Sequence, residues 1–275
     1  MRCVAHVVRS TGRIARIGVP LSGGAPMTPV LALFRASLRR ALPVKRTVLF
    51  GLLSLTPALL FVLAAENRTG EAAFDTLVET SGGAYFGLLM PVIAIVLAAG
   101  ALGDERRDQT LSFITLRPMP RWVIAATKIA AAATAAFAIN LIGIFGLWLT
   151  YSIQHTFNGT ILVGYLVGTV IAVAAYVSIV VPLGFITDRA VIIGLAYLLV
   201  FEDGVVIALS GLASLSPWRL GAAAFAGVVE ESRLILDGAV GNLTMTVANS
   251  AITAGIYVLI GAAITTALLK RRDLA

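Results

Sequence analysis

The chain has 275 residues, of which 59% are hydrophobic and only 13% are charged. Soluble domains carry about 25% charged residues, because a folded surface must be partly polar to stay dissolved. This composition excludes an ordinary soluble globule and indicates an all-α integral membrane protein. The net charge of +7 does not indicate a nucleic-acid partner, because the basic residues cluster at the ends of apolar runs and do not form one basic face.

The chain begins with a basic segment, residues 1–29, that contains glycine, proline and serine. It has no apolar core of the ~7–15 residues that a signal peptide needs. We therefore predict a disordered cytoplasmic tail over these residues.

Residues 30–42 are predicted to form an amphipathic helix. At about 100° per residue its apolar side chains share one side, and the other side carries Arg35, Arg39 and Arg40. Such a helix lies in the membrane interface, where the guanidinium groups meet anionic head groups. The alternative is that these residues form the first turns of a longer span.

Six apolar runs follow, and a helix needs about 20 apolar residues to cross ~30 Å of hydrocarbon. The sequence therefore predicts six membrane spans, at residues 47–65, 84–103, 123–151, 161–187, 190–212 and 251–269. The connection between the first two, residues 66–83, is acidic and is expected to be an outer loop. Between the last two spans, residues 220–229 are apolar enough to dip into the membrane without crossing it.

The distribution of basic residues predicts the orientation. With both termini inside, only Arg68, Arg219 and Arg233 of the twenty-one lysines and arginines lie outside, which leaves eighteen inside. The outer side holds nine of the fourteen acidic residues. The reverse topology would place nearly every base outside, against the tendency of lysine and arginine to remain cytoplasmic.

The most informative stretch runs from Asp104 to Lys128, DERRDQTLSFITLRPMPRWVIAATK. It lies between the second and third spans and carries three acids and five bases. We expect a short cytoplasmic helix that a soluble partner contacts, with the side chain of Lys128 reaching the membrane interface. The alternative is a solvated loop without a partner.

The chain contains no motif that supports catalysis. None of its three lysines follows a glycine, so no Walker A loop can hold nucleotide phosphates, and the patterns H-E-x-x-H and G-x-S-x-G do not occur. One cysteine and two histidines far apart in sequence argue against a metal site. We therefore expect no enzymatic activity, no metal and no cofactor bound by this chain. Asn140, deep in the third span, is expected to form an interhelical hydrogen bond.

Glu202 and Asp203 interrupt the fifth apolar run. A carboxylate in hydrocarbon costs about 2.5–3.5 kcal/mol on insertion scales. One interpretation places the two residues at an aqueous pathway or subunit interface. The other is a wet junction, at which the span breaks and Gly204 turns the chain. The first interpretation supports an alternative function, a self-sufficient secondary transporter that uses Glu202 or Asp203 as a proton or ion site.

Three stretches resemble the family of ABC-2-type permeases, the membrane subunits of ABC transporters. DERRDQTL from Asp104, followed by Arg117-Pro118, Arg121 and Lys128, is similar to the family's segment between the second and third spans. YLLVFEDG, residues 197–204, resembles its fifth-span region, and the basic ending KRRDL resembles its tail.

The resemblance implies the architecture of residues 30–275: an interfacial elbow helix, six spans, a cytoplasmic coupling helix at about residues 104–116, and short re-entrant helices before the last span. It implies an exporter in the cell membrane of a prokaryote, with both termini cytoplasmic. The partners would be two ATP-binding subunits, which hold ATP and Mg, and a second permease copy. The residues expected to contact the ATPase are Asp104, Glu105, Arg106, Arg107, Asp108, Thr110, Leu111, Ile114 and Arg117.

Overall fold

The computed structural model describes residues 29–108, 119–155, 157–205, 215–240 and 245–272. The described residues form helices joined by short connections and contain no strand. The helices are α1 (Pro29–Ala41), α2 (Val44–Ser54), α3 (Thr56–Ala64), α4 (Glu71–Thr80), η1 (Ser81–Leu89), α5 (Met90–Arg107), α7 (Arg121–Gln154), α8 (Gly159–Ile186), α9 (Ala190–Ala196), η2 (Tyr197–Val205), α11 (Pro217–Val228), η4 (Glu230–Ser232), α12 (Arg233–Val240) and α13 (Val247–Arg272). The predicted all-α class is confirmed.

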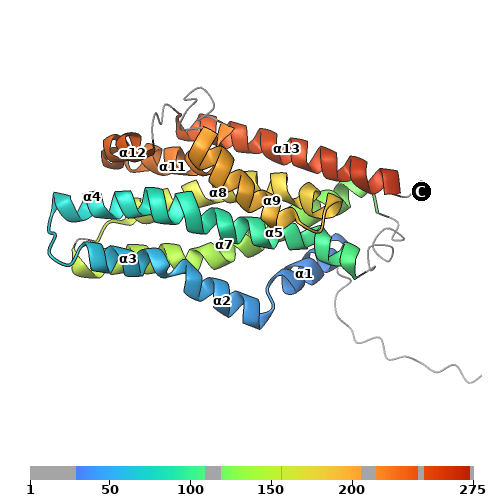
Figure 1. The fold of residues 1–275 in the computed structure, drawn as a ribbon, viewed down its shortest axis with the longest axis horizontal. Helices are drawn as coiled ribbons and strands as arrows, with labels where there is room; N and C mark the ends of the chain where they lie inside the picture. Colours follow the sequence, from blue (N-terminus) through green and yellow to red (C-terminus); the bar gives the residue numbers. More distant parts are fainter. Residues whose placement is uncertain (1–28, 109–118, 156, 206–214, 241–244, 273–275) are drawn as a thin grey trace, which may run out of the picture.

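The long helices run side by side, with α8 at the centre of the bundle (Figure 1). It packs against α5, α7, α11 and α13. The helix α1 and the C-terminal end of α13 lie at one end of the bundle, and α12 and the start of α4 lie at the other (Figure 1). We call these the inner end and the outer end, following the orientation that the basic residues predict.

Five helical segments are long and apolar enough to cross a membrane among the described residues: Val44–Ala64, Glu71–Arg107, Arg121–Gln154, Gly159–Ile186 and Val247–Arg271. The fifth predicted span corresponds to a shorter apolar helix, Ala190–Glu202, and its residues 206–212 lie outside the described part. The chain is thus a multi-pass membrane protein, and the count of six spans stays a prediction.

The first span is two helices and not one. The backbone N–H of Leu55 donates to Leu52, and Pro57 has no N–H to continue the helical ladder. Proline therefore interrupts the helix at Leu55, directly between α2 and α3, as its ring and its missing donor require. Gly143 of α7 lies against the freed end, since a Cβ there would overlap the carbonyl of Ser54.

The prediction of a loop over residues 66–83 is wrong from Glu71 onward, because those residues are helical. Gly70 adopts φ of 60°, a conformation that glycine reaches without a Cβ clash, and it reverses the chain before α4. Glu71 follows in the first helical turn, where a carboxylate interacts favourably with the helix dipole. The helix then continues through the π-helical segment η1 into α5.

Helix α1 forms close to the predicted bounds, and it packs against α7. Leu33 is its buried residue, whereas Val30 and Leu31 are exposed. Its position in the membrane interface stays a prediction. Two short helices, α11 and α12, precede the last span, as expected. The side chains of α11 are mostly buried because this helix packs between α8 and α13.

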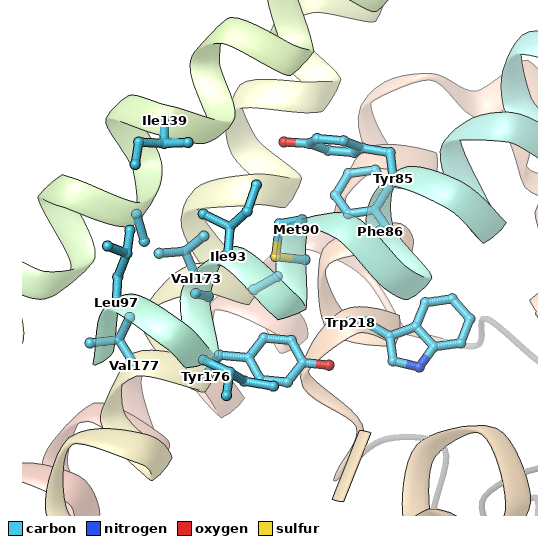
Figure 2. Packing of buried hydrophobic residues seen from close by; sticks show 14 of the residues in the cluster. Tyr85, Phe86, Met90, Ile93, Leu97, Ile139, Val173, Tyr176, Val177 and Trp218 are labelled. Carbon is cyan, nitrogen blue, oxygen red and sulfur yellow. The ribbon is translucent and has the colours of Figure 1, made fainter. Parts of the chain in front are cut away.

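The core lies where η1 and α5 meet α8 and α11. Figure 2 shows Tyr85, Phe86, Met90, Ile93 and Leu97 facing side chains of α7, α8 and α11. Phe86 stacks on Tyr165 with ring centroids 6.3 Å apart. The hydroxyl groups of Tyr85 and Thr169 are 2.9 Å apart, so the buried polar atoms of the aromatic cluster find partners across helices. Helix association in lipid depends on such packing and hydrogen bonding.

Helix α13 approaches α8 most closely at a glycine. Pro182 lies inside α8, and because it has no N–H, the carbonyl group of Ser178 loses its usual helical donor. Gly261 of α13 sits against this carbonyl oxygen, and a Cβ at Gly261 would overlap it. Small residues allow this close approach of two backbones.

Replacement of Gly261 by alanine should therefore weaken the α8–α13 contact. We expect a loss of about 1–3 kcal/mol in the free energy of unfolding, the usual cost of overpacking. Gly255→Ala in the same helix is the matched control, because nothing lies within 4 Å of a Cβ there. It should raise stability by up to about 1 kcal/mol through helix propensity. Unfolding in mixed micelles measures both, and equal stability of the two variants would contradict the packing described here.

Candidate functional site

Charged residues gather at the inner end, around the last turns of α5. Asp104, Glu105, Arg106 and Arg107 form the C-terminal part of α5, and Asp108 caps it. The predicted coupling segment therefore begins as a direct continuation of the second span. Thr110, Leu111, Ile114 and Arg117 lie outside the described residues.

Glu105 and Lys128 form a buried ion pair between α5 and α7. Their side chains are only 6% and 2% exposed. The expectation that Lys128 reaches the interface is wrong, because its ammonium group turns inward to Glu105. A buried charge without a partner is costly, and the pair compensates both charges inside the protein.

Arg106 joins the end of α5 to the end of α8. One guanidinium nitrogen donates to the carbonyl oxygens of Phe185 and Ile186, at 2.9 and 2.6 Å. The other lies 2.5 Å from the carboxylate of Asp188. The last carbonyls of a helix lack intrahelical donors, and a cation at this position also interacts favourably with the helix dipole. Arg106 thus caps α8 from a neighbouring helix.

The remaining charges of this cluster connect α5 to α1 and α2. Arg40 of α1 pairs with Asp108, and Arg46 of α2 lies 4.0 Å from Asp104. Arg107 pairs with Asp104 one turn away in its own helix, at 2.5 Å. These residues are more exposed than Glu105 and Lys128, so each pair contributes little by itself. Together they bring α1, α2 and the end of α5 to one place.

The structure assembles part of the predicted site and adds to it. It brings Arg40 of the expected elbow residues against Asp108, while Arg35 and Arg39 lie on the exposed side of α1. It adds Arg46, Lys128 and Asp188, which the sequence analysis did not assign to this site. One signal for Lys128 was available: a lone lysine inside an apolar run requires a partner, and the acids of the segment 104–108 are the nearest in the chain. Contact of the site with an ATPase stays a prediction.

Glu202 is fully buried between η2 and α8. The hydroxyl group of Tyr176 donates to its carboxyl oxygen at 2.5 Å. Helix η2 continues to Val205, so the helix does not end at Glu202 or Asp203. Residues 206–212, which complete this interpretation, lie outside the described part. Asp203 also lies in η2. The exposed surface of a wet junction is not found at Glu202, which connects two neighbouring helices inside the bundle.

An open cavity of about 720 Å³ lies at the outer end, between the start of α4, the end of α7, η4 and α12. Its lining includes three carboxylates and three aromatic rings: Glu71, Asp75, Glu231, Phe74, Tyr151 and Phe157. No lysine or arginine lines it among the described residues. With no described lysine or arginine beside them, the three carboxylates give this cavity a negative electrostatic potential.

Two further expectations can be compared with the structure. The side-chain amide of Asn140 donates to Ala136 of its own helix at 2.9 Å, so the predicted interhelical bond is wrong. Within the described part of the chain, no group of three or more histidine, cysteine or acidic residues could hold a metal ion.

The buried ion pair yields a direct test. Lys128→Met should destabilise the protein by about 3–5 kcal/mol, because it leaves the carboxylate of Glu105 buried without its cation. The double variant Lys128→Met with Glu105→Leu removes both charges and should recover most of the loss. Unfolding in mixed micelles is the measurement. A single variant as stable as the wild type would show that the pair does not compensate the charges.

The contact of Glu202 is tested in the same way. Tyr176→Phe removes the donor to a buried carboxyl group and should cost about 1–3 kcal/mol. In a Glu202→Gln background the same change should cost less, because the acceptor is no longer a carboxyl group. Equal losses in both backgrounds would mean that the two side chains are not coupled.

The sequence of this chain is similar to that of a known protein family. No curated protein matches the chain. The family model described as ABC-2 family transporter protein matches residues 37–202, which is more than half of the chain and runs from α1 through the inner charged cluster to Glu202. This family consists of membrane transport components and not of enzymes. The chain therefore belongs to the ABC-2 transporter family, as a multi-pass membrane permease.

Proposed function

We propose that this permease is the membrane subunit of an exporter that a separate ATPase drives. The inner charged cluster carries the proposal, because it fixes the start of the segment at residues 104–116 to α1, α2, α7 and α8. An ATPase that closes on ATP can do work on a membrane domain only through a rigid contact. A segment anchored on several helices can transmit such a displacement, whereas a free loop would absorb it.

The assembly that we propose contains two permease copies and two ATP-binding subunits, with ATP and Mg bound by the ATPases. Both termini lie in the cytoplasm of a prokaryotic cell, and the charged segment faces the ATPase. The basic residues of α1 then meet the inner leaflet, whose anionic head groups attract arginine. The acidic cavity at the outer end opens to the exterior.

Isolation of the full-length protein in mild detergent tests this proposal. A soluble subunit with ATPase activity should copurify with it, and Arg107→Glu should weaken that association. Arg107 is suited to the test because its side chain is 54% exposed, so a reversed charge acts on a partner more than on the fold. Glu79→Gln, in the outer half of the molecule, is the control and should copurify normally.

The same preparation also tests the rival function, a self-sufficient secondary transporter. A secondary transporter would use the buried Glu202 as a proton site and would need no second protein. If the purified chain is found without an ATPase, and its proteoliposomes respond to an imposed proton gradient, the proposal is wrong. If the ATPase copurifies and Arg107→Glu releases it, the proposal is supported.

A further inference from the structure

The two adjacent arginines at the end of α5 have different surroundings. The side chain of Arg106 is 18% exposed and contacts α8 and the turn after it. That of Arg107 is 54% exposed and pairs with Asp104 of its own helix. The sequence presents them as equivalent members of one charged motif. In the structure one points into the protein and the other toward solvent.

The contacts of Arg106 hold the α8–α9 turn, residues 187–189. The guanidinium group binds two successive carbonyls, of Phe185 and Ile186, and the carboxylate of Asp188. Guanidinium is planar and presents its donors in a fixed fork, so three contacts from one group restrain position and orientation together. Ile193 in turn donates to the carbonyl of Arg189, so α9 begins directly on the restrained turn.

The backbones of α5 and α8 also touch beside this contact. A Cβ at Gly184 would overlap the carbonyl group of Ala99, and a Cβ at Gly103 would lie 3.1 Å from the carbonyl oxygen of Gly184. At these two glycines the backbones of the helices are in direct contact. Movement of the end of α5 is therefore passed to the end of α8, and packed contacts of this kind adopt discrete arrangements.

We propose that Arg106 is a positioning residue that makes the α8–α9 turn move together with the coupling segment during the ATP cycle. Through α9 and η2 the same motion reaches Glu202 and its bond to Tyr176. The inference rests on the proposed function, because it needs an ATPase that displaces the segment after Asp108. It divides the motif into an inward residue, Arg106, that carries motion and an outward residue, Arg107, that faces the partner.

The test measures the position of the turn in the complete complex. Cys3 is replaced by serine, and spin labels are placed at Arg189→Cys and Lys270→Cys, two exposed positions on the turn and on α13. Distances within one chain are measured by pulsed electron resonance without nucleotide and after trapping with ATP and vanadate. In the protein with Arg106 intact, the distance between the two labels should change on trapping.

Arg106→Gln should abolish this change while the complex still hydrolyses ATP. The matched control is Lys45→Gln, which removes an exposed positive charge of α2 at the same end of the bundle and should leave the distance change as in the wild type. Networks of this kind contribute about 0.5–2 kcal/mol of coupling. Arg106→Gln should therefore reduce the factor by which the permease stimulates ATP hydrolysis by about 2- to 30-fold. Arg106→Lys keeps one charged contact and should restore part of both signals.

A second variant covers the case in which Arg106→Gln does not fold. Asp188→Asn keeps the hydrogen bonds of Arg106 to the α8 carbonyls and removes only the ion pair, so it should fold and reduce the distance change. An unaltered change in Arg106→Gln or Asp188→Asn would overturn the inference, as would a turn that does not move in the wild type. A chain that brings down no ATPase would instead overturn the proposed function.

Discussion

The need to compensate charge inside an apolar bundle governs the inner end of this protein. Lys128 enters the third span as a single charge, and Glu105 at the end of the second span neutralises it. Because the two residues lie on different helices, their pairing fixes the position of α5 relative to α7. The exposed ion pairs around them are individually weak. They act on helices whose relative position the buried pair has already fixed.

The central position of α8 follows from a second constraint, the close packing of backbones in lipid. Small residues let neighbouring helices approach it at several heights, at Gly184 toward α5, at Gly168 toward α11 and at Ser178 toward Gly261 of α13. Without a hydrophobic force between helices, this packing and the buried hydrogen bonds hold the bundle together. Helix α8 therefore contacts most of the other long helices.

The two ends of the bundle differ in chemistry. The inner end carries the mixed charges that join α5 to α1, α2 and the turn after α8, and the outer end carries an open, acidic and aromatic cavity. Between them, the hydrogen bond from Tyr176 to Glu202 connects α8 to η2 inside the bundle. The contacts of Arg106 and Glu202 thus link α8 to the α9–η2 segment at two heights.

The sequence by itself determined the all-α membrane class and the positions of most spans, because lipid requires long apolar helices, and its basic residues predict the orientation. It also located the charged segment after the second span. Only the tertiary structure decided which charges face inward, since Arg106 and its partners are separated by 79 and 80 residues in the chain. Local pattern also failed at residues 71–83, where acidic side chains suggested a loop, although packing of α4 and η1 against neighbouring helices stabilises a helix there. Pairing between distant residues depends on how helices are arranged, and one-dimensional periodicity does not contain that arrangement.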